Sequence, residues 1–339
     1  MVKAMKFNHL WKLVGNTPMI EIAYRHKGEH HKLYVKCEQY NFTGSIKDRA
    51  ALYLLEQAYG EGFFKTGDII VEASNGNSGL SFSAIGRILG HEVRILLPDC
   101  DSRDRIDVLW SLGAKVILVS EEAGGLTGAI TMAGSMACRN KQVFLPRQFE
   151  ERYNVEVHER TTGREIWTQL QSIDIIPDAF VAGVGTGDTI AGVGKYLRGK
   201  NPSVKIHPLE ATESPVLSTG CKAGIHRIHG ISNEFTPAIT EFERPDCIIG
   251  VSDGDAIIMA QKLAGQLGLR VGISSGANLL GAIKVQQEMG AQAKVVTVFS
   301  DSDVMYLRTH LLPEEPVRDG YLSPDVELLE YRTLETPRK

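Results

Sequence analysis

The feature that most constrains the fold is a regular alternation of short apolar runs with longer amphipathic segments. The apolar runs are expected as strands and lie at 32–38, 68–73, 92–98, 115–120, 142–146, 179–185, 205–211 and 293–300. Helical patterns lie between them, among them 44–62, 76–90 and 102–114. Because parallel strands need a crossover connection, which is usually a helix, this alternation predicts α/β layers with mostly parallel sheets.

The length of 339 residues suits two domains rather than one. We expect a smaller domain over 51–150, a larger domain formed by 1–50 and 151–315, and a C-terminal appendage over 316–339. With 43% apolar residues, 23% charged residues and a formal net charge of -4, the composition is that of an ordinary globular protein. This charge does not indicate nucleic acid or an anionic membrane as a partner.

Several features predict a cytoplasmic location. The five cysteines are spread without a CxxC pair, which suits a reducing compartment better than a disulfide framework. The first residues, MVKAMKFNHLWKLVGNTPM, contain neither a long apolar run nor a small-residue cleavage site. No stretch approaches the roughly 20 apolar residues that span a bilayer. We therefore expect a soluble, cytoplasmic chain without a signal peptide.

Four loops carry residues that are able to do chemistry. In an open parallel sheet, ligands bind beyond the carboxyl ends of the strands, where loops lead into helices. Three glycine-rich loops have this position: ASNGNSG at 73–79, GVGTGDTIAG at 183–192 and GISSGAN at 272–278. The fourth loop, NFTGSIKDRA at 41–50, places Lys47 where a helix begins. Lys47 is either an ordinary surface charge or a nucleophile presented to a bound molecule.

Each glycine-rich loop has a binding interpretation and a simpler one. The loop 183–192 can aim backbone N–H groups and the hydroxyls of Thr186 and Thr189 at a phosphate, or it is a plain tight turn. Its glycine spacing matches a dinucleotide fingerprint poorly, and it lacks a Walker A lysine. The loops 73–79 and 272–278 could bind polar groups or simply cap helices. No metal site is expected, because no histidine pair has a matching carboxylate or cysteine at ligand spacing.

Taken in order, these segments resemble the cysteine synthase and cystathionine β-synthase family, the fold-type II enzymes that use pyridoxal phosphate (PLP). The matching segments cover nearly the whole chain and are LVGNTPMIEI (13–22), TGSIKDRAA (43–51), EASNGNSG (72–79), QFEERYNVEVHERTTGREIW (148–167), the stretch 183–218, GISNEFTP (230–237), GISSGAN (272–278) and VFSDSDVMYL (298–307). The resemblance implies two three-layer α/β domains, similar to tryptophan synthase β. The larger domain would bind PLP, and the smaller one would be mobile and close over the substrate.

The resemblance also implies roles for individual residues. Lys47 is expected to form a Schiff base with PLP and then to remove the substrate Cα proton. Asn77 would hydrogen-bond the ring hydroxyl oxygen, and Ser274 would face the pyridine nitrogen. A neutral serine there makes the ring a weaker electron sink, which suits β-elimination. The phosphate would be bound by Gly185, Thr186, Gly187 and Thr189, and the substrate carboxylate by Ser74, Asn75, Ser78 and Gln148.

Two departures from the family pattern lie in the predicted binding loops. Ser74, Asn75 and Ser78 stand where the family usually shows Thr, Ser and Thr, so hydrogen-bond donors remain. Asp188 replaces a glycine beside the phosphate cup. Because a carboxylate that faces a phosphate is repelled, we expect the Asp188 side chain to turn away or to cap the helix.

The third departure, Glu234, is the most informative about the substrate. It lies in Ser232-Asn233-Glu234, where cysteine synthases show a small uncharged turn and cystathionine β-synthases carry an aspartate. A carboxyl group there could protonate a leaving hydroxide or activate water, as unactivated serine or cysteine would require. The alternative is a surface glutamate at the mouth of the cleft.

The expected activity is PLP-dependent β-replacement or β-elimination on a serine- or cysteine-type amino acid through an aminoacrylate, as in cysteine synthesis from O-acetylserine and sulfide. The alternative is a cysteine lyase or β-replacing enzyme that releases hydrogen sulfide, with Glu234 as acid and base. A serine or threonine dehydratase, or a binding domain without turnover, is a further alternative. By resemblance we expect a homodimer, a sulfide, thiol or water nucleophile, and a serine acetyltransferase as a candidate partner.

Overall fold

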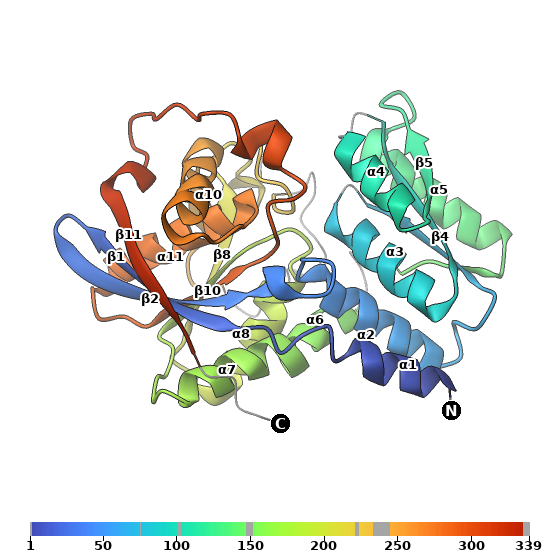
Figure 1. The fold of residues 1–339 in the computed structure, drawn as a ribbon, viewed down its shortest axis with the longest axis horizontal. Coiled ribbons are helices and arrows are strands. Elements are labelled where there is room, and N and C mark those ends of the chain that lie inside the picture. The colour runs from blue at the N-terminus through green and yellow to red at the C-terminus, as the bar shows by residue number, and fades with distance from the viewer. Residues whose placement is uncertain are drawn as a thin grey trace. The chain divides into compact units, whose positions relative to one another are not determined.

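The chain folds as two compact units, each made from two separate stretches of sequence (Figure 1). A computed structural model describes residues 2–74, 76–99, 103–146, 152–220, 224–232 and 245–334. Unit 1 is formed by Met1–Gly15 and Asn41–Asn154, and unit 2 by Asn16–Tyr40 and Val155–Lys339. Lys47 and the loop 73–79 therefore belong to unit 1, whereas the loops 183–192 and 272–278 belong to unit 2.

Unit 1 contains a four-stranded sheet in which every described pairing is parallel. Its described strands are β3 (Ile69–Ala73), β4 (Glu92–Pro98), β5 (Lys115–Val119) and β6 (Val143–Phe144), in the order β5-β4-β3-β6. Its described helices are α1 (Val2–Leu10), α2 (Lys47–Gly60), α3 (Asn77–Leu89), α4 (Arg103–Ser111) and α5 (Gly125–Arg139), and α6 (Arg152–Val157) leads into unit 2.

Helices cover both faces of the unit 1 sheet, because successive strand side chains pack alternately against one helical layer and the other. A Cβ added at Gly86 of α3 would lie 2.7 Å from both Ile70 Cδ1 and Val93 Cγ2, so these residues face α3. The neighbouring strand residues Val71 and Leu96 instead share a core cluster with alanines of α5. Because successive strand residues point to opposite faces, this pattern makes three layers, helix, sheet and helix.

Unit 2 contains a seven-stranded sheet in the order β11-β1-β2-β10-β7-β8-β9. Its strands are β1 (Met19–His26), β2 (Glu29–Cys37), β7 (Ala179–Gly183), β8 (Lys205–Ala211), β9 (Ile249–Val251), β10 (Val295–Phe299) and β11 (Val326–Thr333). The pairings from β2 to β9 are parallel, and β1 is antiparallel to both β2 and β11. The described helical segments are η1 (Glu38–Tyr40), the π-helix η2 (His158–Gly163), α7 (Arg164–Gln171), α8 (Asp188–Lys200), α9 (Val216–Thr219), α10 (Asp253–Leu267), α11 (Ile273–Met289), the π-helix η4 (Leu307–Leu311) and η5 (Ser323–Asp325).

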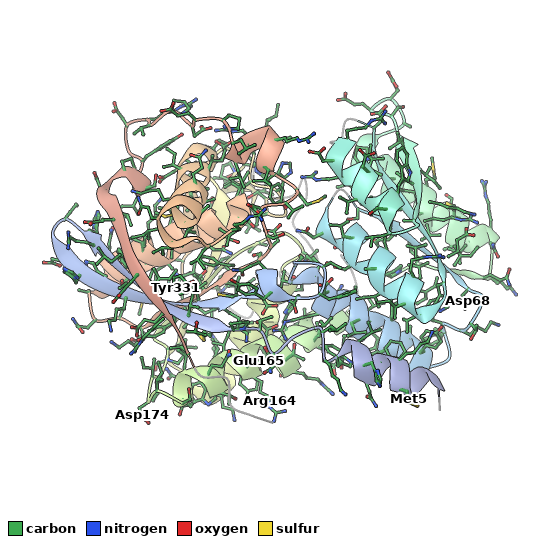
Figure 2. All side chains as sticks on the ribbon, in the orientation of Figure 1. Met5, Asp68, Arg164, Glu165, Asp174 and Tyr331 are labelled. Atoms are coloured by element: carbon green, nitrogen blue, oxygen red, sulfur yellow. The ribbon has the colours of Figure 1, made fainter. Side chains whose placement is uncertain are left out.

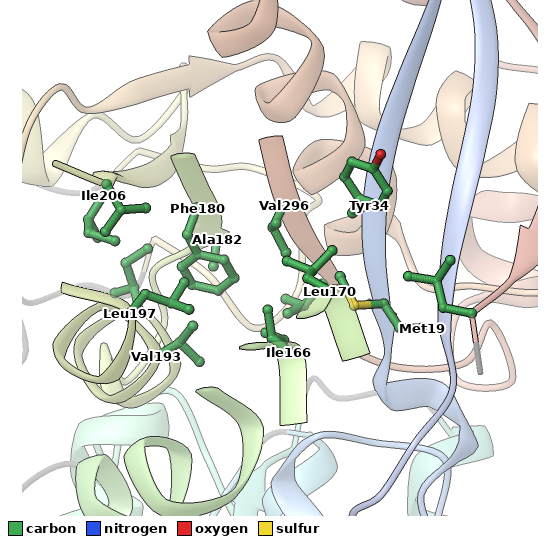
Figure 3. Packing of buried hydrophobic residues seen from close by; sticks show 14 of the residues in the cluster. Met19, Tyr34, Ile166, Leu170, Phe180, Ala182, Val193, Leu197, Ile206 and Val296 are labelled. Carbon is green, nitrogen blue, oxygen red and sulfur yellow. The ribbon is translucent and has the colours of Figure 1, made fainter. Parts of the chain in front are cut away.

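The unit 2 sheet is also covered on both faces. On one face, Phe180 and Ala182 of β7 lie in a buried cluster with residues of α7 and α8 (Figure 3). On the other face, a Cβ at Gly281 of α11 would lie 2.3 Å from Leu209 Cδ1 and 3.2 Å from Val181 Cγ1. These opposite contacts again give three layers. The predicted α/β fold with mostly parallel sheets is therefore confirmed.

The eight predicted strands are all present, and the sequence did not indicate β1, β9 or β11. The observed division of the chain also differs from the expected one at 1–15, 41–50, 316–339 and, by four residues at the domain boundary, 151–154. The first two stretches lie in the smaller unit, because α1 and α2 pack on α3. The stretch 316–339 contributes β11, which pairs with β1 and so covers what would otherwise be an exposed sheet edge.

No helix in the described part of the chain is both long enough and apolar enough to cross a membrane.

Candidate active site

Lys47 is the first residue of α2 and is held there by the turn before it. The Thr43 backbone N–H and hydroxyl both donate to the Asp48 carboxylate, each at 2.6 Å. Ser45 Oγ accepts the Lys47 backbone N–H at 3.2 Å. Asp48 is fully buried, and hydrogen bonds to a carboxylate are among the stronger ones in proteins. Asp48 therefore holds the turn closed and fixes the backbone from which the half-buried Lys47 side chain projects.

The loop before α3 is fixed by a serine hydroxyl. Ser74 Oγ accepts the backbone N–H of Gly76 at 3.2 Å and that of Gly79 at 3.1 Å. Asn77 and Ser78 begin the helix, with Ser78 buried and Asn77 half-buried. Ser74 therefore satisfies one N–H in the first turn of α3, whose N-cap residue is Gly76. Binding of a substrate carboxylate by this loop stays a prediction.

The loop between β7 and α8 leaves no room for side chains at two of its glycines. A Cβ at Gly185 would lie 2.0 Å from the Gly230 carbonyl oxygen, and one at Gly183 would lie 2.6 Å from Ile231 Cγ2. Gly187 has a φ of 82°, in the left-handed region that glycine adopts without strain. Glycines are thus required in this loop because it packs closely against the segment that contains Gly230 and Ile231, and because the chain turns sharply into α8.

The polar side chains at the start of α8 are buried. Thr186, Asp188 and Thr189 are each less than a tenth exposed. Asp188 is the first residue of α8, directly after the N-cap residue Gly187, and its Oδ1 accepts the Thr189 backbone N–H at 2.8 Å. The expectation that this side chain turns away from a phosphate or caps the helix stays a prediction. A helix N-terminus with glycines that bring the backbone close and two threonine hydroxyls has the donors that bind a phosphate.

The segment 224–232 forms a wall along this loop, which the sequence did not indicate. Besides the Gly230 contact with Gly185, the Ser232 N–H donates to the Val184 carbonyl at 2.8 Å. The Ser232 hydroxyl accepts the Ala211 N–H at 2.8 Å. These contacts engage mainly backbone atoms, which leave no compositional signal. They hold the 224–232 segment against the ends of β7 and β8.

Arg227 anchors the 224–232 segment to two acidic residues. Its guanidinium donates to Asp253 at 2.7 and 3.0 Å and to Glu315 at 2.7 Å through two nitrogens. These hydrogen bonds, to Glu315 and then Asp253, raise the pKa of Arg227. Burial alone would raise the pKa of Asp253, but the hydrogen bonds and charge of Arg227 hold it below its ordinary value. Arg227 and Asp253 therefore stay ionised near neutral pH.

The first turn of α11, which carries Ser274, lies at the end of β10, where Ser275 Oγ accepts the Ser300 N–H at 3.0 Å, and the phosphate-type loop follows the neighbouring parallel strand β7. Ser274 is buried in the first turn of α11. One helical turn further on, Asn278 Oδ1 accepts the Gly183 N–H at 2.8 Å, and Asn278 Nδ2 donates to the Val298 carbonyl at 2.9 Å. Asn278 thus ties the end of β7 to β10 and places α11 relative to both. Asn278 lies in GISSGAN, but nothing in the sequence distinguished it as a supporting residue.

Three predicted site residues, Asn75, Gln148 and Glu234, lie outside the described residues. Their expected roles stay predictions. The described members of the predicted site divide between the units. Unit 1 carries Lys47, Ser74, Asn77 and Ser78, and unit 2 carries Gly185, Thr186, Gly187, Thr189 and Ser274.

A buried lysine links two of the motifs quoted from the sequence. Lys36 Nζ lies 2.8 Å from Glu165 Oε2 and 2.7 Å from the Thr17 carbonyl oxygen. Glu165 belongs to α7 and is labelled in Figure 2. Glu165 Oε1 also accepts the Asn16 N–H at 2.9 Å. A fully buried ammonium group is tolerated only when it is paired and hydrogen-bonded, as here. Lys36 therefore fixes where the chain enters unit 2 after Gly15.

The described residues offer little for thiol or metal chemistry. Burial raises the pKa of Cys37 to about 12, which keeps this thiol protonated and unreactive. The described cysteines Cys37, Cys138 and Cys247 are free rather than disulfide-bonded. Among the described residues, no three His, Cys, Asp or Glu side chains gather as metal ligands would.

Comparison with known proteins places this site in a family. The model of the pyridoxal-phosphate dependent enzyme family matches residues 10–301. A cysteine synthase of Staphylococcus aureus is 37% identical over 304 residues, which are 90% of this chain and 96% of that protein. The crystal structure of a hydrogen sulfide-producing enzyme from Fusobacterium nucleatum is 47% identical, with a TM-score of 0.95, and the match covers 98% of this chain and 99% of that one.

A variant of the same Fusobacterium enzyme was crystallised in complex with an α-aminoacrylate intermediate, with an aspartate replaced by asparagine. It is 47% identical to this chain, with a TM-score of 0.93, and the match covers 98% of both chains. The predicted fold type, PLP as the cofactor and the enzyme class with β-replacement and β-elimination chemistry are thereby confirmed. This chain belongs to the pyridoxal-phosphate dependent enzyme family.

Proposed function

We propose that the loop between β7 and α8 holds the phosphate of PLP through Gly185, Thr186, Gly187 and Thr189. The observation that carries this assignment is the contact of Gly185, where a Cβ would lie 2.0 Å from the Gly230 oxygen. A backbone this closely packed fits a ligand that is bound by N–H groups rather than by long side chains. The dipole of α8 adds to the attraction for a dianion.

Three further side chains are proposed to act on the cofactor and the substrate. The Lys47 amine would hold the cofactor through its carbonyl carbon until the substrate amine displaces it, and the freed Nζ would then accept and carry the substrate Cα proton. Asn77 donates to the ring oxygen, and the Ser274 hydroxyl faces the ring nitrogen. When bound, the cofactor supplies an electron sink for the bond that breaks at Cα. Asp48 supports this step by holding the turn from which Lys47 projects.

The substrate carboxylate is proposed to bind at the N-terminus of α3. Ser74 and Ser78, together with Asn75 and Gln148, supply the hydroxyl and amide groups for it. Ser74 already orients the backbone N–H of Gly79 through its own oxygen. A carboxylate at this helix end would also gain from the helix dipole. Closure of the smaller domain over the substrate would exclude water from the reacting carbon.

We propose that sulfide is the leaving group, released from cysteine, with water as the incoming nucleophile and serine as the product. The support is the 47% identity, over 98% of this chain, to a hydrogen sulfide-producing enzyme. Glu234 is proposed to move the protons that this reaction requires, to the sulfur and from the water. The second candidate, cysteine synthesis from O-acetylserine and sulfide, is supported by 37% identity to a cysteine synthase.

The test supplies cysteine, O-acetylserine with sulfide, and serine separately to the purified protein. Sulfide release and amino-acid products are measured. Cysteine should give equal amounts of sulfide and serine, and Glu234→Gln should slow this reaction far more than cysteine synthesis. Rapid cysteine synthesis with no sulfide release from cysteine would support the second candidate instead. Formation of a keto acid from serine would favour the dehydratase.

Lys47→Ala is the control for the whole assignment and should remove every one of these activities. The matched variant is Lys12→Ala, which replaces an exposed lysine of unit 1 and should leave these activities nearly unchanged. A Lys47→Ala protein that still turned over cysteine at the normal rate would refute the proposed role of Lys47.

The assembly and location of the protein are also proposed rather than observed. By resemblance the chain forms a homodimer in the cytoplasm, and a serine acetyltransferase is a candidate partner. Light scattering of the purified protein would give the oligomeric state. Co-purification with the acetyltransferase of the same cell would test that partner, and a lack of any complex would remove it from the proposal.

A further inference from the structure

Asp188 uses donors that the proposed function assigns to the phosphate. Its Oδ1 accepts the Thr189 backbone N–H at 2.8 Å and lies 3.4 Å from the Thr189 hydroxyl. Asp188 is buried, so its carboxylate cannot exchange these donors freely for water. A carboxylate and a phosphate would therefore compete for the same N–H and the same hydroxyl at the N-terminus of α8.

His158 lies next to Asp188 and Thr189. Its Nε2 lies 3.9 Å from Asp188 Oδ2 and 3.5 Å from Thr189 Oγ1, and its Nδ1 lies 2.9 Å from Thr162 Oγ1. The ring is completely buried in η2. Because the Thr162 hydroxyl can accept as well as donate a hydrogen bond, it is compatible with a protonated ring.

Close packing keeps His158 beside the first turn of α8. A Cβ at Gly192 of α8 would lie 2.3 Å from the Val155 carbonyl oxygen and 2.7 Å from His158 Cβ. The two helical segments can approach this closely only because residue 192 is glycine. The histidine is thus held where an aspartate at the start of α8 can reach it by a change of side-chain rotamer.

We propose that Asp188 is a built-in competitor for the phosphate cup, with His158 as the group that receives it. Without a phosphate, Asp188 holds the Thr189 N–H and hydroxyl. When a phosphate takes these donors, the carboxylate turns toward His158, and a proton bound by this ring offsets part of the repulsion between the two anions. The affinity for the cofactor phosphate is therefore lower than the same loop would give with a neutral residue at position 188.

This inference rests on the proposed phosphate role of the loop, and it differs from a purely structural cap in one respect. A structural cap stabilises α8, so its loss would weaken the binding of any ligand in the site to the same extent. An anionic competitor acts only on ligands that carry the phosphate. The contrast between PLP and pyridoxal, which lacks the phosphate but keeps the aldehyde and ring, separates the two roles.

The experiment titrates the full-length protein, freed of cofactor, with PLP and with pyridoxal and follows protein fluorescence. The quantity of interest is the ratio of the pyridoxal Kd to the PLP Kd. Asp188→Asn keeps an oxygen that can accept the Thr189 N–H but removes the charge, and should raise this ratio on the order of tenfold. Asp188→Gly, which removes the side chain entirely, should raise it as well and serves if the asparagine variant folds poorly.

The matched control is Asp255→Asn. Asp255 is also a buried carboxylate in the first turn of a unit 2 helix, where it accepts the Leu322 and Ser323 N–H groups, each at 2.8 Å. Its loss should lower stability and leave the ratio unchanged. His158→Gln should lower the ratio in the otherwise unchanged protein and have little effect when combined with Asp188→Asn, because the charge it offsets is then absent.

Each outcome has a definite meaning. An unchanged or lowered ratio in both Asp188 variants would overturn the role of Asp188 as a competitor. An equal effect of His158→Gln in both backgrounds would overturn its role as the receiving group. If the unchanged protein bound PLP no more tightly than pyridoxal, the phosphate assignment itself would fail, which is a different result from a failure of the inference.

Discussion

The loops that begin α3 in unit 1 and α8 in unit 2 follow the same plan and are fixed in different ways. Both follow a parallel strand, contain glycines and start a helix that covers the sheet. The α3 loop is held by a neutral hydroxyl, that of Ser74, and a Cβ at Gly79 would first meet the Ile95 side chain at 3.2 Å. In the α8 loop the carboxylate of Asp188 accepts the Thr189 N–H, and Gly185 is packed against backbone.

The two loops therefore differ in how far their surroundings can shift when a group binds or a side chain is added. A side chain such as Ile95 can shift by a few tenths of an ångström, whereas the backbone of the 224–232 segment is held by several hydrogen bonds. The α8 loop is therefore suited to one unchanging group, such as the cofactor phosphate. The α3 loop can adjust, which fits the proposed binding of a substrate that arrives and leaves.

The largest expected effect is at Gly185. Gly185→Ala should destabilise unit 2 by about 3 kcal/mol and abolish PLP binding, because its methyl group would overlap the Gly230 oxygen. Gly79→Ala should change stability by less than about 1 kcal/mol, since alanine favours the helix and Ile95 can move. Chemical denaturation and PLP titration measure both. Equal effects of the two substitutions would break the comparison between the loops.

A control within the same helix is available. Gly199 lies in α8, and a Cβ there meets nothing described within 4 Å. Gly199→Ala should leave PLP binding unchanged and stabilise the protein by up to about 1 kcal/mol. A loss of PLP binding in this variant would mean that replacing any glycine of this region weakens PLP binding, and that close packing at Gly185 is not the cause.

The next effect concerns Arg227, which anchors the wall beside the α8 loop. Arg227→Met should cost about 2 kcal/mol at pH 7, because it leaves Asp253 and Glu315 without their cation. Fluorescence of Trp167 reports on unit 2 once Trp11 and Trp110 of unit 1 are replaced by phenylalanine.

The same pair predicts a dependence on pH. The pKa of Asp253 is lower in the folded protein than in the unfolded chain, so its contribution is complete above about pH 4 and is lost as the pH falls through the folded value. The stability difference between the Arg227→Met variant and the unchanged protein should therefore shrink below this pH. Urea unfolding at pH 7, 5, 4 and 3 measures it, and a difference that grew in acid would contradict the ion-pair explanation.

Asn278 offers a test of comparable size within the site. Asn278→Leu removes the acceptor of the Gly183 N–H and the donor to the Val298 carbonyl, leaving two buried backbone groups unpaired. The expected cost is about 2 kcal/mol, with weaker PLP binding because the end of β7 loses its support. Asn201→Leu, which removes the hydrogen bonds of an asparagine just after α8, is the control and should affect PLP binding little.

The smallest expected effect is at Ser74. Ser74→Ala removes the oxygen that accepts the Gly76 and Gly79 N–H groups and should cost about 1 kcal/mol. The KM for the amino-acid substrate should rise, while the Kd for PLP should stay nearly constant. A change confined to PLP binding would reverse the roles proposed for the two loops.

Much of the strand and loop order could be predicted because it is local in the sequence. The strands that are buried on both faces, such as β4 and β8, appear as continuous apolar runs. β1 and β11 escaped notice because their antiparallel pairing joins residues as distant as Ile20 and Thr333, and β11 is largely exposed. β9 has only three residues, too few for a pattern.

The site shows the same division. Lys47, Gly185 and Ser274 could be proposed because small or reactive residues beside a predicted helix start are visible in the sequence. The support from Arg227 and Asn278 was not found, because their partners are acidic groups and backbone atoms far away along the chain. Such contacts exist only once β7, β10 and their helices have come together.

The sequence by itself determined the α/β class, the order of the strands that carry the loops and the chemical identity of the proposed site residues, because periodicity and glycine placement are local properties. Only the tertiary structure decided that residues 1–15 join the smaller unit, that β11 completes the larger sheet and that Asp188 lies between Thr189 and His158. These depend on which distant surfaces can bury apolar area and pair their polar groups at the same time.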